Sequence, residues 1–308
     1  MTQLFRIAFL RARLYFHPRI DSLICRYMPV DPKRSRVVFQ KLERDLVKLS
    51  SKPRPDNVHG FRTATRRLQI LLGELSPKPD RNQKKLLKLL GRIRKRAGKV
   101  RDLDVQLAAL HSLKVPREPR RKTQLVNRLI ELRGRQEKKL QKAGGKETVR
   151  EIRKRLKRAA KSFIPEASRD PLLVAREMLA EINRSDAPVS EALLHQYRIL
   201  SKRARYAAEF ADRSTEAEQF IAGVKRVQDA LGDWHDWLTL TQTASKHLGE
   251  VRESPMVAEL HNVTGAKYRH AVAALSHMRT QSARAEETAA RPPARSPAKT
   301  DRPAVSAA

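Results

Sequence analysis

Cysteine is nearly absent from this sequence, and aromatic residues are few. Cys25 is the only cysteine in 308 residues, so no disulfide can form within the chain and a cysteine-based zinc site is excluded. This indicates a reducing compartment, and we expect a cytoplasmic protein. Aromatic residues make up 5% of the chain and are missing from the basic helix faces described below, which argues against a stacking surface for single-stranded nucleic acid.

Long apolar runs are also missing. No stretch reaches the roughly 18 to 20 apolar residues needed to cross a bilayer, so no transmembrane segment is expected. Near the N-terminus the apolar residues are interrupted by Arg6, Arg11, Arg13, Arg19 and Arg26, and no signal peptide is predicted. We interpret residues 1–35 as an N-terminal helical extension that docks on the first bundle. A membrane anchor that includes Leu4, Phe5 and Leu14 is the alternative.

Acidic residues are scarce relative to basic ones. Lys and Arg total 66 against 33 for Asp and Glu, which gives a formal net charge of +33 and a pI near 11.1. Such an excess predicts a polyanionic partner. Nucleic acid, an anionic membrane surface and a phosphate polymer all fit the charge, so other features must rank them.

What the sequence does contain is helical periodicity, with almost no strand-like alternation. Apolar residues recur three and four positions apart, as at Leu86, Leu90, Ile93 and Ala97, and the predicted fold class is all-α with about ten helices. Helix breakers fall at 51–55, 76–79, 114–119, 143–145, 164–171 and 186–188. Residues 283–308 are rich in Ala, Arg, Pro and Ser, and we expect a disordered basic tail there.

The chain contains an internal repeat. A shift of 136 positions lays His59–Arg67 on His195–Arg203, so the motif His-x-x-Arg-x-x-x-(Arg/Lys)-Arg occurs twice. Farther along, a shift of 134 pairs Gly98 with Gly232, and Arg101-Asp102 with His235-Asp236. We therefore predict two homologous antiparallel helical bundles of about four helices each, at about 36–162 and 168–281.

Each copy of the motif places basic residues on one helix face. In the first copy Phe61, Ala64 and Leu68 share an apolar stripe that predicts core, and the basic residues lie well away from it. We call the basic residues the paired basic rows: His59, Arg62 and Arg66 in the first copy, and His195, Arg198, Lys202 and Arg205 in the second. Cations at i and i+4 repel by a few tenths of a kcal/mol, so their repetition in both copies favours an anionic ligand. Phosphate oxygens suit Arg and Lys donors.

A further basic row follows on the next predicted helix. It consists of Lys84, Lys88, Arg92, Lys95 and Lys99, opposite the apolar residues of the same helix. We expect this downstream row to flank the paired basic rows and to share the ligand. The alternative is a solvated helix face, which is the ordinary interpretation of a single charged row.

These motifs resemble those of a known family. The duplicated motif, together with Arg101–Val105, Gln228–Asp233 and Lys202–Phe210, is similar to the CHAD family, the conserved histidine α-helical domain. The resemblance covers about residues 36–282. It implies a pair of four-helix bundles around a basic central cleft that binds inorganic polyphosphate, often at polyphosphate granules. Two positions depart from the family pattern, since Gln69 replaces a basic residue and His235 replaces an Asn.

The resemblance also assigns binding residues. It carries a polyphosphate-binding role to His59, Arg62, Arg66, Arg67, Arg101, His195, Arg198, Lys202, Arg203 and Arg205, and we add Lys88, Arg92, Lys95 and Lys99 of the downstream row. Arg67 and Arg203 lie at the flank of their rows, so ion pairs with Asp or Glu are the alternative for them. For the two histidines, a structural role is as plausible as ligand contact.

No catalytic machinery is recognisable. Asp102, Asp104, Asp233 and Asp236 are interpreted as residues that cap helices or position cations, and neither an E-x-E-x-K motif nor a P-loop is present. We expect no cofactor, no metal and no enzymatic activity. Trp234 and Trp237 are predicted to lie in the core. The expected function is non-catalytic polyphosphate binding, and the alternative is a protein that binds DNA or RNA through the same surface, with weak nucleic-acid binding expected at most beside polyphosphate.

Overall fold

The computed structural model describes residues 30, 32–76, 78–113, 119–164, 169–184, 188–249, 251 and 254–290, and this part is all-helical, as predicted. The helices are α1 (Pro32–Ser51), α2 (Pro55–Gly73), α3 (Arg81–Ser112), α4 (Pro119–Ala143), α5 (Lys146–Ser162), α6 (Pro171–Arg184), α7 (Glu191–Ala208), α8 (Thr215–Leu248) and α9 (Pro255–Ala290). Every predicted break coincides with a helix junction. The break after α8, at Gly249 with φ of 91°, was missed although the glycine signals it.

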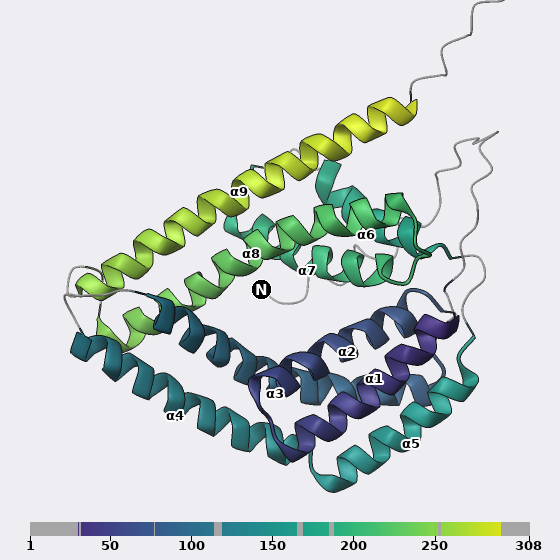
Figure 1. The fold of residues 1–308 in the computed structure, drawn as a ribbon, viewed down its shortest axis with the longest axis horizontal. Helices are drawn as coiled ribbons and strands as arrows, with labels where there is room; N and C mark the ends of the chain where they lie inside the picture. The colour runs from purple at the N-terminus through teal and green to yellow at the C-terminus, as the bar shows by residue number, and fades with distance from the viewer. Residues whose placement is uncertain are drawn as a thin grey trace, which may run out of the picture.

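The helices form two layers that meet along their inner sides (Figure 1). Helices α1 to α5 pack on one another in the lower layer, and α6 to α9 pack on one another in the upper one. The first bundle has five helices, where about four were predicted, because α5 folds back along α1 and α3. The layers contact each other through α2 with α7, α3 with α8, and α4 with α8. The helices that carry the two copies of the motif therefore lie side by side.

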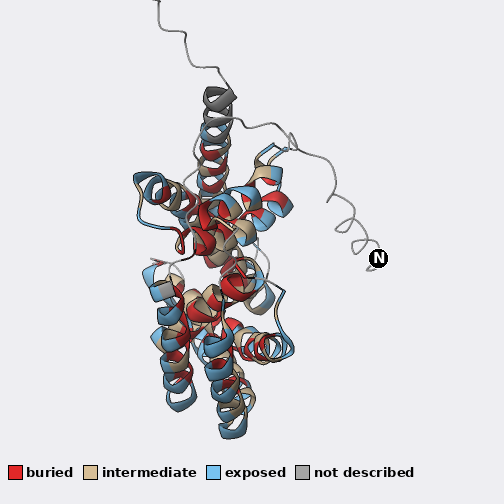
Figure 2. Cartoon of the chain, turned by 90° about the vertical axis from the view of Figure 1, so that its right-hand side faces the viewer, coloured by how far each residue is buried: buried red, intermediate tan, exposed pale blue. Residues whose placement is uncertain are grey.

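Two apolar cores hold the layers together. The larger core includes the buried side chains of Phe61 on α2, Tyr197 on α7 and Trp234 on α8. The prediction that Trp234 lies in the core is confirmed. A smaller core at the far end joins Leu110, Leu129, Leu240 and Leu260 from α3, α4, α8 and α9, with Trp237 packed against it. Each buried Leu contributes about 1.5 to 3 kcal/mol of apolar burial. Figure 2 shows buried residues along the inside of both layers and exposed ones outside.

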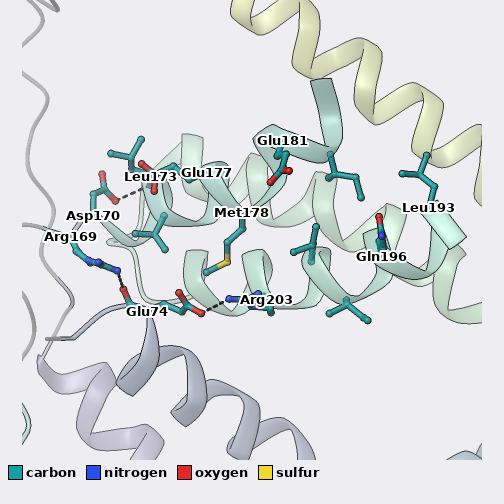
Figure 3. A pocket seen from close by; sticks show the side chains of 14 residues that line it. Glu74, Arg169, Asp170, Leu173, Glu177, Met178, Glu181, Leu193, Gln196 and Arg203 are labelled. Atoms are coloured by element: carbon teal, nitrogen blue, oxygen red, sulfur yellow. Dashed lines mark hydrogen bonds and ion pairs between the residues drawn. The ribbon is translucent and has the colours of Figure 1, made fainter. Parts of the chain in front are cut away.

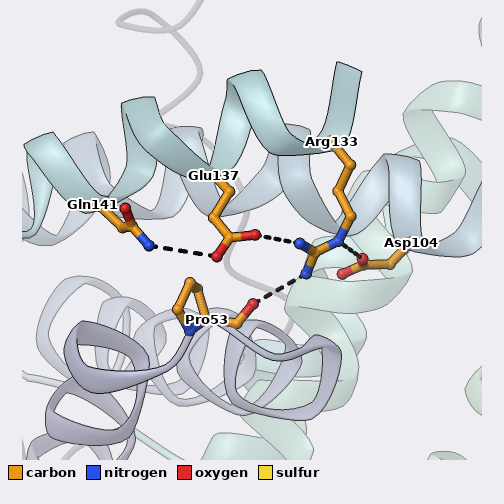
Figure 4. Close-up of polar contacts among 5 residues, drawn as sticks. All are labelled: Pro53, Asp104, Arg133, Glu137 and Gln141. Atoms are coloured by element: carbon orange, nitrogen blue, oxygen red, sulfur yellow. Dashed lines mark hydrogen bonds and ion pairs between the residues drawn. The ribbon is translucent and has the colours of Figure 1, made fainter. Parts of the chain in front are cut away.

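A polar network ties α4 to its neighbours (Figure 4). Arg133 on α4 donates through Nε to Asp104 Oδ1 on α3 at 2.6 Å and through Nη2 to the Pro53 carbonyl oxygen at 3.1 Å, and it also pairs with Glu137. The Asp104 side chain is 5% exposed, so this ion pair is largely shielded from water. Asp104 thus positions a cation, and in the described residues no group of His, Cys, Asp and Glu is arranged to hold a metal ion.

The helix ends follow local sequence chemistry. Ser190 caps α7, since its Oγ accepts the N–H of Leu193 at 3.2 Å. In contrast, α2 begins at Pro55, with Arg54 at the capping position. At the other end of the chain, α9 continues to Ala290, past residue 283, where the sequence predicts that the tail starts. Ala and Glu are good helix formers, and the helix ends before Pro292 and Pro293. Residues 291–308 and 1–29 lie outside the described residues.

Across the described ranges, no helix is both long enough and apolar enough to span a bilayer.

Candidate functional site

The paired basic rows converge where the two layers meet. Arg62 and Arg66 on α2 interact electrostatically with Lys202 on α7, and Arg66 also interacts with Arg198. Arg94 and Arg101 of α3 join the same group through Arg62. We call these residues, with the carboxylates among them, the inter-layer cluster: His59, Arg62, Arg66, Arg94, Arg101, Asp102, His195, Arg198, Lys202 and Asp236.

Arg62 is fitted closely against α3. Its Nη1 donates to the carbonyl oxygen of Arg94 at 3.3 Å. A Cβ added to Gly98 would lie 2.5 Å from that Nη1, so the missing side chain of Gly98 makes room for the guanidinium. Burial lowers the pKa of Arg62, Asp102 opposes this, and the neighbouring Arg66 lowers it further.

Two carboxylates provide the negative charge within the cluster. Asp236 Oδ1 lies 3.9 Å from Arg198 Nη2. Asp102 is an exposed residue, yet desolvation by the surrounding protein raises its pKa, against the opposing effects of Arg62, His235 and Arg198. The sequence shift of 134 positions pairs Asp102 with Asp236. Asp102 lies among cations from both layers, and Asp236 lies beside Arg198 and Lys202 of α7.

The cations outnumber these carboxylates, and several of their donors are unmet. Arg66 and Lys202 form no hydrogen bond or ion pair with any described residue. Buried Nε atoms of Arg94 and Arg198 also lack a hydrogen-bond partner there. Burial lowers the pKa of Lys202 to about 7, Arg198 and Arg66 lower it as well, and Asp236 opposes them. Buried donors without partners are costly, so the cluster is poised to accept an anion.

The two histidines lie at the rim of the cluster with exposed side chains. Burial and then Arg101 lower the pKa of His59, and burial and then His235 lower that of His195. The rings of His195 and His235 are stacked, with centroids 6.0 Å apart and planes at 27°. The lowered pKa values favour the neutral form of both motif histidines, in which each ring offers one donor and one acceptor.

Three of the predicted residues are engaged by acidic or aromatic neighbours. Arg67 Nε lies 2.7 Å from Glu209 Oε2, and Arg203 Nη2 pairs with Glu74 Oε1. Arg205 lies over the ring of Tyr206, 4.9 Å from its centroid, and its Nε is 3.8 Å from Glu209 Oε1. For Arg67 and Arg203 the structure has the ion pairs that were the alternative to ligand contact.

The downstream row lies on a different face of α3. Lys88, Arg92, Lys95 and Lys99 are all exposed. At 100° per residue, Lys95 and Lys99 are turned about 100° to 140° away from Arg94. Arg94 is a member of the cluster that the sequence analysis did not predict. Its spacing from Gly98 and Arg101 is the signal that could have identified it, because this spacing places all three residues on one helix face. The α3 residues that reach the cluster are therefore Arg94 and Arg101 rather than the downstream row.

No cavity described here is lined by the cluster. Two cavities, of about 850 and 970 Å³, lie on either side of α6. The basic central cleft therefore stays a prediction. What the structure shows is that charged side chains of both layers converge where the layers meet.

The fold is similar to a crystal structure of the CHAD domain from the plant Ricinus communis, with a TM-score of 0.57 and 20% identity over 81% of this chain and 89% of that one. It is also similar to PptA from Streptomyces chartreusis, with a TM-score of 0.59 and 18% identity over 83% of this chain and 99% of that one. At these identities the likeness shows the fold alone.

Sequence comparison is more decisive. No curated protein matches the chain. A family model for the CHAD domain, however, matches residues 38–245, which include both copies of the motif and every residue of the inter-layer cluster. The chain therefore belongs to the CHAD domain family.

Proposed function

We propose that this protein binds inorganic polyphosphate at the inter-layer cluster and does not cleave it. The observation that carries the proposal is the convergence of Arg66 and Lys202 from helices α2 and α7, because neither cation has a hydrogen bond or ion pair with a described residue. A ligand with closely spaced negative charges relieves the repulsion between them and meets the unmet donors of Arg94 and Arg198. Membership of the CHAD family supports the same ligand.

Phosphate chemistry suits the donors that the cluster offers. Each arginine presents a planar fork that matches two phosphate oxygens, and Lys202 presents a compact charge. Polyphosphate repeats the phosphate group along a flexible chain, so one polymer would contact donors from α2, α3 and α7 together. Asp102 and Asp236 then act as internal counterions that hold Arg62 and Arg198 in place while the site is empty.

Competition between polyanions tests the choice of ligand. Long-chain polyphosphate should bind the full chain at near-physiological salt. It should resist displacement by an excess of duplex DNA or RNA, with both polymers counted as moles of phosphate. Nucleic acid presents phosphates at fixed spacing, and the inter-layer cluster includes no Phe, Tyr or Trp on which its bases would stack. Equal displacement by DNA or RNA would replace polyphosphate binding with general polyanion binding.

The absence of catalysis is tested separately. Incubation of the purified protein with polyphosphate and Mg²⁺ or Mn²⁺ should release no phosphate above the rate of a buffer control. Release that disappears in Asp102→Asn or Asp236→Asn would contradict the proposal, because it would give these carboxylates a catalytic role.

Binding to polyphosphate predicts where the protein accumulates. A fluorescent fusion should gather at polyphosphate granules in cells that contain them, and an Arg62/Arg66/Arg198/Lys202→Ala variant should be diffuse. The same fusion in cells that lack polyphosphate is the control. A fusion that stays diffuse in granule-rich cells would contradict granule targeting without contradicting binding in vitro.

A further inference from the structure

A groove between α6 and α7 is acidic, although the chain as a whole carries a net charge of +33 (Figure 3). It has a volume of about 850 Å³ and extends along both helices to the end of α2. Its lining includes four carboxylates and two arginines, namely Glu74, Asp170, Glu177, Glu181, Arg169 and Arg203.

Most of these charges already have partners, and two do not. Arg203 pairs with the Glu74 carboxylate, and Arg169 Nη1 donates to the Glu74 carbonyl oxygen at 2.6 Å. Asp170 Oδ1 accepts the N–H of Leu172 at 2.7 Å and caps α6. Glu177 and Glu181 have neither a hydrogen bond nor an ion pair with a described residue. They lie four positions apart on α6, where like charges repel, so this side of the groove lacks compensating cations.

The groove is also apolar where it is open. Leu173 on α6 is 55% exposed and Ile199 on α7 is 45% exposed, and both line the groove. Covering them removes apolar surface from water, which favours an apolar ligand. A peptide that is both apolar and cationic therefore fits this surface better than a purely basic one.

The chain supplies such a peptide. Residues 1–20 hold four arginines and no acidic residue, with apolar side chains such as Leu4, Phe9 and Phe16 between them. We propose that residues 1–20 occupy the groove, with their apolar side chains on Leu173 and Ile199 and their arginines beside Glu177 and Glu181. This replaces the expected docking on the first bundle.

The chain is long enough for this arrangement. The first turn of α1 lies at the end of α7, because Arg34 Nη1 donates to the carbonyl oxygens of Glu209, at 3.3 Å, and of Ala211. Arg203, at the near end of the groove, precedes Glu209 by about 9 Å of helix. Residues 21–30 span up to about 33 Å when extended, so residue 20 reaches the groove easily.

The cavity on the other side of α6 fits the segment less well. It shares Leu173 and Glu177, but Asp229 there pairs with Lys225 at 3.2 Å and Asp233 pairs with Lys267 at 3.0 Å. Two of its carboxylates are thus already compensated. Charge complementarity therefore favours the groove between α6 and α7.

Disulfide trapping in the full chain tests this proposal. In a Cys25→Ser background, Phe9→Cys is combined with Ile199→Cys in the groove, with Phe220→Cys in the other cavity, or with Val37→Cys on α1. Val37 is 53% exposed and closer along the chain to the segment, so it is the matched control for random encounters. Docking predicts that an intramolecular disulfide forms with Cys at 199 at least about fivefold faster than with Cys at 37 or 220.

Charge reversal provides the second measurement. Glu177→Lys with Glu181→Lys should slow trapping at position 199 about fivefold and speed tryptic cleavage after Arg13 by a similar factor, because two ion pairs of moderate strength are lost. Trapping that is equal at 199 and 37, faster at 220, or found only between two copies of the chain would overturn the proposal. So would trapping and cleavage rates that charge reversal leaves unchanged.

Discussion

Arg67 on α2 lies 2.7 Å from Glu209 at the end of α7, and the same relationship recurs with the helices exchanged, since Arg203 on α7 pairs with Glu74 at the end of α2. Arg67 and Arg203 are the last residues of the two copies of the motif. Each motif thus binds the end of the helix that carries the other. These reciprocal ion pairs hold α2 and α7 side by side and keep their basic rows facing one another.

We predict that Arg67 and Arg203 contribute to stability more than to ligand binding. Arg67→Ala should lower the free energy of unfolding by about 1 to 2 kcal/mol, because it removes the closer of the two cations beside the partly buried Glu209 and leaves only Arg205, at 3.8 Å. Polyphosphate affinity at a temperature where the variant is folded should change less than about threefold. A double-mutant cycle with Glu209→Ala, followed by chemical denaturation, should give a coupling energy near 1 kcal/mol. A large loss of affinity at unchanged stability would show that Arg67 contacts the ligand instead.

Gly98 should matter for binding, whereas its counterpart Gly232 should not. A Cβ at Gly98 would lie 2.5 Å from Arg62 Nη1 and would displace the flexible guanidinium, but a Cβ at Gly232 meets nothing within 4 Å. Gly232→Ala should therefore stabilise the helix by about 0.5 to 1 kcal/mol and leave affinity unchanged. Gly98→Ala should weaken polyphosphate binding severalfold at little cost in stability. Equal effects of the two substitutions on affinity would contradict the placement of Arg62 in the site.

Lys202 should make binding dependent on pH. Its pKa in the free protein is about 7, so it is largely charged at pH 6 and largely neutral at pH 8.5. A bound polyanion favours the charged form, and affinity should fall by about tenfold across this interval, with proton uptake on binding near neutral pH. Titration calorimetry in buffers of different ionisation enthalpy measures the uptake. Lys202→Arg should flatten the profile, and a wild-type profile that is already flat would contradict this role.

Lys202 should also destabilise the unliganded fold. Its pKa is lowered from 10.5 to about 7, so between these values the unfolded chain binds more protons and stability rises with pH. Below pH 7 both states are protonated and the penalty is fully present. Lys202→Met should therefore raise the free energy of unfolding by about 1 to 3 kcal/mol at pH 6, and the gain should vanish near pH 10.5. Urea unfolding at the two pH values measures this, and a variant less stable than wild type at pH 6 would contradict it.

The elements of the fold that sequence reasoning found are those with strong local signals. Breaks at proline and glycine, the apolar stripe through Phe61 and Leu68, and the burial of Trp234 follow from chemistry within a few residues. The presence of five helices in the first bundle could not be predicted in this way. The sequence of α5 shows that the helix is amphipathic, but it does not identify α1 and α3 as the helices on which α5 packs. The junction between α7 and α8 contains neither glycine nor proline, and it also escaped prediction.

The candidate site was predicted in part for a similar reason. Repetition identified Arg62, Arg66, Arg198 and Lys202, because an arrangement that repels itself is unlikely to recur by chance. The downstream row was grouped with them because its spacing is regular, but regular spacing does not tell which face of α3 meets α2. Arg94 lies on that face, but the sequence around it is so rich in Lys and Arg that its charge alone does not mark it as a site residue. Only the packing of α2 on α3 distinguishes it.

The most direct test of the account compares these two sets of cations. Long-chain polyphosphate is titrated into wild type, into Arg62/Arg66/Arg198/Lys202→Ala, and into Lys88/Arg92/Lys95/Lys99→Ala, which removes the same charge from the outer face of α3. The account predicts that the first variant, still folded by circular dichroism, loses affinity at least about a hundredfold, whereas the second loses only a few-fold through long-range electrostatics. Equal losses in the two variants would show that polyphosphate responds to net charge alone and would contradict a site between the layers.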